Sequence, residues 1–229
     1  MHIGLIGGLG PAATVNYYRE LISRTRERDL PLELTMAHAN VNTLLNNQAR
    51  GDATAQLAVY RAISHRLRAA GATSIVIPAI GGHFCFTDES ANLPLPIIDA
   101  IDAVNDEIKA QHFEKIGILG TRSVMTSALY GRISKAEVVH LPARVTDHVH
   151  EAYVSMATRG YTQDDERSLI ENAYDYLVQQ EQVDTVILGG TDLSLVFDGQ
   201  SERTLILDCA EAHLKAIVRE LQGSEGQKA

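Results

Sequence analysis

Three glycine-containing stretches of the sequence carry side chains that can move protons or donate hydrogen bonds. The loop "GGLGPAAT" (7–14) ends in Thr14, and "IVIPAIGGH" (75–83) ends in His83, whose imidazole can shuttle a proton near neutral pH. The stretch "VILGGTDLS" (186–194) carries Thr191 and Asp192, and burial can turn a carboxylate into a base by raising its pKa. These residue types predict binding of a small carboxylate, with proton transfer as the candidate chemistry.

The first loop, which contains Gly10 and Pro11, follows an apolar run and opens a helical pattern. Its backbone N–H groups and the Thr14 hydroxyl can bind a carboxylate at a helix N-terminus, and a tight structural turn is an equally compatible interpretation. A dinucleotide site is not favoured. Pro11 stands where that motif packs its helix, and the next strand, "LTMAHAN", ends without an acidic residue.

The composition excludes several classes of partner. A net charge of −9 disfavours nucleic acid or an anionic membrane as the main partner, since both repel an acidic surface. No apolar run approaches the roughly 18 residues of a membrane span. Cys85 and Cys209 lie far apart and have no metal-ligand spacing, which predicts reduced thiols, a cytoplasmic location and no metal site.

Short apolar runs alternate with amphipathic stretches along the chain, which predicts an α/β fold with parallel sheets covered on both faces. The predicted strands are 2–8, 32–39, 73–79, 115–121, 136–142, 184–190 and 203–208, and the predicted helices are 11–28, 54–71, 96–111, 164–181 and 210–222.

Two pairs of motifs repeat in the same order. "IGLIGG" begins at Ile3 and "IGILGT" at Ile116, while "SIVIPA" ends at Ala79 and "TVILGG" at Gly190. The repeat predicts two pseudo-symmetric lobes, each a parallel sheet flanked by helices, with an interlobe cleft at the carboxyl ends of the strands. The first lobe comprises 1–97 plus 209–229 and the second 98–208. A carbon between two such walls can lose a proton to one and gain a proton from the other.

The stretches "GLIGGLGPAATVNYY" (4–18), "GILGT" (117–121) with Tyr130, "GGTDLSLVF" (189–197) and "LDCAEAH" (207–213) resemble the aspartate/glutamate racemase family along essentially the whole chain. The resemblance implies cofactor-independent racemisation of an acidic amino acid, one catalytic cysteine per lobe and a homodimer.

Both cysteine positions of the family pattern are replaced. Where the family resembles "CNTxH", this chain reads Ala79 to His83, and where it resembles "GCTE", Gly190 holds the place of the thiol. Since neither alanine nor glycine can move a proton, the standard two-thiol mechanism is predicted to be absent. Cys85 and Cys209 are interpreted as small buried hydrophobic residues.

The candidate catalytic residues are therefore His83 and Asp192. The alternatives are a histidine hydrogen-bonded beneath its loop and an aspartate that caps the following helix. Arg50 is a candidate carboxylate clamp or an exposed loop residue. The full set of predicted substrate contacts is Gly10, Pro11, Thr14, Arg50, Gly81, Gly82, Thr121 and Thr191.

Three functions remain open from the sequence. The first is an amino-acid racemase or related isomerase that uses substitute groups, acting on an acidic amino acid or similar small carboxylate. The second is a non-catalytic carboxylate-binding pseudoenzyme. The third, a lyase or decarboxylase on the same scaffold, is the weakest, because such members of the family keep one cleft thiol.

Overall fold

The computed structural model describes residues 1–86, 93–197 and 204–226. It divides into two compact units, the first formed by Met1–Ala100 with His213–Ala229 and the second by Ile101–Ala212. The borders expected from the sequence lie after residues 97 and 208 and stay a prediction. No helix in the described part of the chain is long and apolar enough to cross a membrane.

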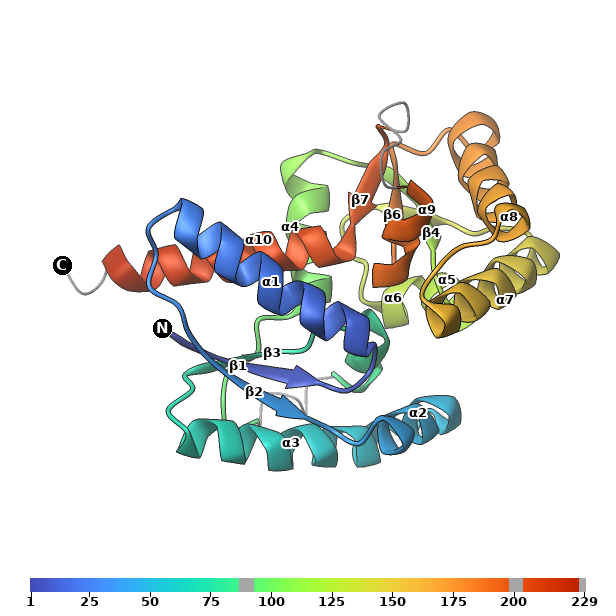
Figure 1. Ribbon diagram of the computed structural model, residues 1–229. Coiled ribbons are helices and arrows are strands. Elements are labelled where there is room, and N and C mark those ends of the chain that lie inside the picture. The colour runs from blue at the N-terminus through green and yellow to red at the C-terminus, as the bar shows by residue number, and fades with distance from the viewer. Residues whose placement is uncertain (87–92, 198–203, 227–229) are drawn as a thin grey trace. The chain divides into compact units, whose positions relative to one another are not determined.

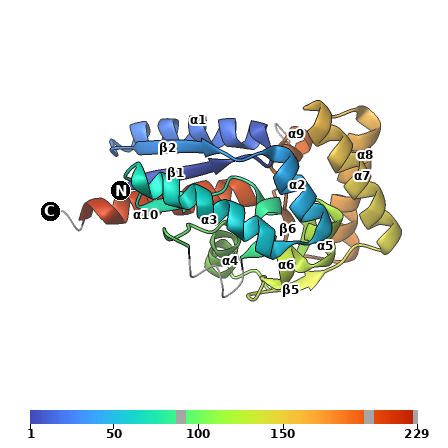
Figure 2. The same cartoon turned by 90° about the horizontal axis from the view of Figure 1, so that it is seen from below.

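The first unit is built on a parallel sheet with the strand order β2-β1-β3. Ile3, Leu5 and Ile6 of β1 are buried because helices cover both faces of the sheet. Figures 1 and 2 show α1 and α3 on opposite faces. Its elements are β1 (His2–Gly7), α1 (Pro11–Glu27), β2 (Glu33–His38), α2 (Val41–Arg50), α3 (Ala53–Ala69), β3 (Ser74–Val76), the 3₁₀ helix η1 (Ile80–Cys85) and most of α10 (Cys209–Gly226).

The second unit contains a four-stranded parallel sheet with the order β5-β4-β6-β7. All residues of β6 are buried, as expected for a central strand. Helices α7 and α8 lie side by side (Figure 1). The elements are α4 (Ala100–Ala110), β4 (Lys115–Leu119), α5 (Arg122–Thr126), α6 (Ala128–Gly131), β5 (Glu137–Val139), α7 (Ala143–Arg159), α8 (Asp164–Asp175), the π-helical turn η3 (Tyr176–Gln180), β6 (Thr185–Leu188), the 3₁₀ helix η4 (Thr191–Leu193), α9 (Ser194–Phe197) and β7 (Ile206–Asp208).

The two sheets share one topology. A parallel bridge between Ile75 and Ile97 extends the first sheet beyond β3, at the place that β7 takes beside β6 in the second. β1 corresponds to β4, β2 to β5 and β3 to β6. The prediction of an α/β fold with two parallel sheets flanked by helices is confirmed, and the cleft expected between the lobes stays a prediction.

Two of the longer helices, α2 and α7, were not predicted, nor were the short helices α5 and α6, and one predicted helix begins later than expected. α2 forms within an Asn-rich stretch because the Asn40 side chain accepts a hydrogen bond from the Thr43 N–H at 3.0 Å. α7 was missed altogether. The predicted helix 96–111 begins only at Ala100, because Ile97 is extended and pairs with Ile75.

Candidate functional site

Ala79 and Gly190 occupy equivalent places in the two units. Each residue has extended backbone after a strand, β3 or β6, and precedes a 3₁₀ helix, η1 or η4. The carbonyl of Ala79 accepts from the Gly82 N–H at 2.9 Å, and that of Gly190 accepts from the Leu193 N–H at 3.1 Å. Both positions therefore present one residue at the tip of a strand, where a functional side chain could be held rigidly.

The space beside Gly190 is filled by Tyr153 of α7. A Cβ atom added to Gly190 would lie 2.5 Å from the Tyr153 ring, closer than real Cβ contacts allow. The tyrosine ring therefore takes the volume in which a cysteine side chain would start.

Tyr153 also contacts the carboxyl group of Asp192. Its hydroxyl donates to Asp192 Oδ2 over 3.4 Å. Burial raises the pKa of Asp192 above its ordinary value, although the hydrogen bond from Tyr153 opposes the shift. Burial and the nearby Asp192 carboxylate also raise the pKa of Tyr153, so the phenol stays protonated and acts as a donor. Asp192 thus accepts a hydrogen bond from α7.

Thr121 lies at the end of the neighbouring strand. The Gly189 N–H donates to the Leu119 carbonyl at 2.7 Å, which keeps the ends of β4 and β6 together. Thr121 stands two residues after the end of β4, and Thr191 stands three residues after the end of β6. The Thr121 hydroxyl also caps α5, where it accepts from the Val124 N–H at 3.4 Å.

In the first unit, the predicted glycine-loop contacts form the start of α1. Gly10 is exposed and has a left-handed φ of 64°, a conformation that favours glycine, and Pro11 is the first helical residue. Thr14 is buried, and its hydroxyl donates to the Gly10 carbonyl over 3.4 Å. The loop is therefore a tight turn that leaves exposed backbone at the helix N-terminus.

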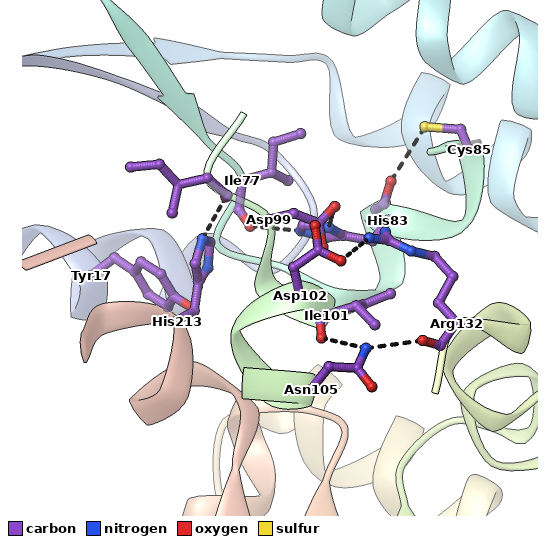
Figure 3. A network of polar contacts seen from close by, with 12 residues as sticks. Tyr17, Ile77, His83, Cys85, Asp99, Ile101, Asp102, Asn105, Arg132 and His213 are labelled. Carbon is purple, nitrogen blue, oxygen red and sulfur yellow. Dashed lines mark hydrogen bonds and ion pairs between the residues drawn. The ribbon is translucent and has the colours of Figure 1, made fainter. Parts of the chain in front are cut away.

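His83 is completely enclosed, with 0% of its surface exposed. Its Nε2–H donates to the Ile77 carbonyl at 3.2 Å, and Nδ1 lies 3.2 Å from Asp99 Oδ2 (Figure 3). Because both ring nitrogens are engaged, this geometry favours a histidine that holds its loop over one that meets a ligand. His213 makes a parallel arrangement, with Nε2 donating to the Ile98 carbonyl at 2.8 Å and Nδ1 accepting from the Tyr17 hydroxyl at 3.1 Å.

The glycines of η1 are packed against polar side chains. Gln48 Nε2 donates to the Gly81 carbonyl at 3.0 Å, and a Cβ atom on Gly82 would lie 2.4 Å from the Tyr60 hydroxyl. Arg50 is exposed at the end of α2, not in a loop, and donates to Asn47 Oδ1 at 3.3 Å.

The two cysteines are buried, Cys85 at the end of η1 and Cys209 directly after β7 at the first residue of α10. Burial raises the pKa of Cys85 to about 12, and its thiol contacts the Gly82 carbonyl at 3.5 Å. The pKa of Cys209 is also raised, mainly by burial and secondly by the charge of Asp208. Asp208 caps α10, accepting from the Ala210 N–H at 2.7 Å. Both thiols are therefore protonated near neutral pH, which makes them poor bases.

Sequence reasoning missed Tyr153 and Asp99. Tyr153 was overlooked because α7 was not recognised, although its buried Val149, Ala152 and Met156 recur at helical spacing. Among the described residues, no group of three or more His, Cys, Asp or Glu side chains could hold a metal ion.

The family model described as Asp/Glu/Hydantoin racemase matches residues 6–217. The chain belongs to this family. The solved structures agree: a protein of the Asp/Glu racemase type from Yersinia pestis shares 25% identity and a TM-score of 0.87 over 97% of this chain and 100% of its own. An aspartate racemase homologue from Pyrococcus horikoshii shares 25% identity and a TM-score of 0.79 over 96% of this chain and 99% of its own.

The curated relatives align with a smaller part of this chain than the solved structures do. The glutamate racemase of Mycobacterium tuberculosis is 28% identical over 144 residues, which is 60% of this chain and 51% of that protein. The aligned part of the chain thus spans about half the length of the curated relatives it matches. Family membership supports a racemase-like function at the level of reaction class.

Proposed function

We propose that this chain binds an acidic amino acid or a similar small carboxylate and moves its α-proton through Asp192 rather than through a pair of thiols. The observation that carries the proposal is the Asp192–Tyr153 pair beside Gly190, where the family pattern has a cysteine. A partly buried carboxyl group with a raised pKa accepts a proton more readily at neutral pH than an exposed one. Tyr153 orients that carboxyl group by its hydrogen bond.

Thr121 and Thr191 support carboxylate binding in the same unit. Both hydroxyls follow the ends of adjacent strands, so both can donate to one ligand carboxylate. The predicted contacts of the first unit (Gly10, Pro11, Thr14, Arg50, Gly81 and Gly82) remain part of the proposal, with His83 as a positioning residue. Cofactor independence and a cytoplasmic location also remain part of it.

Calorimetric titration with L-aspartate and L-glutamate tests the binding part of the proposal. We expect Thr121→Ala and Thr191→Ala each to weaken binding about fivefold, the loss of one hydrogen bond to a charged group. Thr158→Ala is the matched control, because the exposed Thr158 hydroxyl donates to the Val154 carbonyl of its own helix at 2.7 Å. Equal affinity in all three variants, or no binding of either amino acid, would contradict the proposal.

A homodimer is the assembly that the proposal adopts from the family resemblance. Val15, Tyr18 and Ile22 are large exposed apolar residues at helical spacing on α1, and they offer a face for a second copy. Sedimentation velocity should show a dimer that Tyr18→Glu dissociates and that Tyr161→Glu, at an exposed residue elsewhere, leaves intact. A monomeric wild-type protein would contradict this assembly.

A further inference from the structure

A cavity of about 360 Å³ lies within the second unit, at the carboxyl ends of β4 and β5 beside α5 and the start of α7. Its volume is in the range of small-molecule sites, roughly 300–1,000 Å³. Of the described residues, those assigned above to proton transfer and carboxylate binding are not among its lining. The cavity is therefore a candidate for a separate ligand.

The interior of the cavity is apolar. Ile118, Met125 and Leu141 are buried core residues with side chains on its wall, and Val139 adds a further aliphatic surface. Such a wall favours a hydrocarbon group, since burying one gains about 25 cal/mol per Å² of apolar surface.

Two oppositely charged side chains, Arg122 and Asp147, line the cavity. Arg122 Nε donates to Asp147 Oδ1 at 2.6 Å, and the side chains of the two residues are 48% and 51% exposed. In the described part of the chain this ion pair uses only the Nε edge of the guanidinium. The planar Nη edge, suited to bidentate contact with a carboxylate, faces no described partner.

Two histidines bond to the backbone of α5 beside the ion pair. The Arg122 backbone N–H donates to His150 Nδ1 at 3.2 Å, and burial, followed by the Arg122 charge, lowers the pKa of His150. His150 is therefore neutral at pH 7 and can accept this bond. His140 donates through Nδ1 to the Met125 carbonyl at 3.2 Å, which holds this ring against the cavity wall.

We infer that this cavity binds an α-amino acid with an apolar side chain. Arg122 takes the α-carboxylate, Asp147 takes the α-ammonium group, and the side chain packs on the wall around Met125. A ligand with a single charge is repelled by the member of the ion pair that has the same sign. A zwitterion can place each of its charges beside the opposite charge of the pair. This inference goes beyond the proposed function, because it concerns a different ligand class and different residues.

NMR titration of the ¹⁵N-labelled whole chain with L-leucine tests the inference. We expect saturable shifts at the amides of Met125, Thr126 and Leu141. Two analogues serve as matched probes: 4-methylpentanoate, which lacks the ammonium group, and 3-methylbutylamine, which lacks the carboxylate. Each should bind about tenfold more weakly than L-leucine, because each loses one charge-assisted contact.

Variants separate a specific site from general attraction. Arg122→Gln should weaken L-leucine about tenfold, whereas Arg144→Gln, which removes an equal charge from an exposed position nearby, should change the affinity by less than about twofold. Unshifted amides outside the cavity confirm that each variant is folded. The inference is overturned by an absence of saturable shifts, by shifts confined to residues 189–193, by equal binding of either analogue, or by equal effects of the two variants.

Discussion

The space beside Gly190 in which a side chain would lie is occupied by a residue of α7. The ring of Tyr153 lies where a Cβ atom would meet it at 2.5 Å, and the same tyrosine donates to Asp192. The space at this strand tip is thus occupied by a polar arrangement rather than left empty. Introducing a cysteine at this strand tip requires the ring to move.

Gly190→Cys should therefore lower the free energy of unfolding by about 1–3 kcal/mol, the usual cost of overpacking. In a double-mutant cycle with Tyr153→Ala, which removes the obstructing ring, the coupling should be favourable by about 1 kcal/mol or more. Urea denaturation of the four proteins measures both quantities. Strict additivity would show that the ring does not fill this space.

The two native cysteines should react slowly with iodoacetamide. Both thiols are buried and protonated, with the pKa of Cys85 raised to about 12 by burial, whereas alkylation requires the thiolate. Mass spectrometry should show rapid labelling only after unfolding, and L-aspartate should protect neither site. Fast labelling of the native protein at one cysteine, blocked by L-aspartate, would identify a relocated nucleophile.

The short helix α6 contains three consecutive residues with a strained, left-handed backbone. Ala128, Leu129 and Tyr130 have consecutive φ values of 53°, 52° and 62°, in the left-handed region that costs roughly 1–2 kcal/mol per non-glycine residue. The Ser127 hydroxyl accepts from the Tyr130 N–H at 2.8 Å and helps to hold this turn. Such strain persists only where the surroundings fix the conformation.

Ala128→Gly should leave the free energy of unfolding unchanged or raise it, because relief of strain offsets the greater entropy of the unfolded chain. Ala157→Gly, in the interior of α7, is the matched control and should cost about 1 kcal/mol. Thermal unfolding of both variants gives the comparison. A loss of stability in Ala128→Gly as large as that in the control would argue against strain at this turn.

Helix α10 is held in place by His213, a neutral buried histidine. Burial, followed by the nearby His83, lowers the pKa of His213 from 6.5 to about 4. Between these values the unfolded chain binds a proton that the folded protein does not, so the stability due to this group is present above the higher value and is lost as pH falls toward the lower one.

His213→Gln, which can still donate to the Ile98 carbonyl, should therefore flatten the loss of stability between about pH 7 and pH 5. His148→Gln, at an exposed histidine, should retain the wild-type slope. Urea denaturation at the two pH values measures the difference. An unchanged slope in His213→Gln would mean that this histidine is not kept neutral by folding.

The sequence predicted the sheets better than the helices that complete the site. Buried parallel strands appear as apolar runs, so β1, β4 and β6 were located from residue types alone. α7 was missed because its buried face includes Thr146 beside Val149 and Met156, which weakens the apolar pattern. The sequence thus located Gly190 and Asp192, but Tyr153 comes from a helix far along the chain, and only folding places it there.

At the scale of the whole molecule, two units of the same topology differ in chemistry. Ala79 and Gly190 stand at equivalent strand tips, and neither can move a proton. In the second unit Asp192 lies next to such a tip, whereas in the first His83 is fully buried with both ring nitrogens engaged. A single acid/base group returns a proton to the same face of the substrate Cα from which it removed one. Exchange of the Cα proton with solvent should therefore be faster than inversion of the Cα configuration.

Exchange of the Cα proton of L-aspartate and L-glutamate in heavy water, followed by NMR together with the enantiomer ratio, tests this account most directly. We predict deuterium incorporation faster than racemisation, reduced by about 100-fold or more in Asp192→Asn and unchanged in a Cys85→Ser, Cys209→Ser double variant. The absence of exchange despite binding would contradict proton transfer by this protein. Exchange that survives Asp192→Asn but is abolished in the double variant would show that thiols carry the reaction after all.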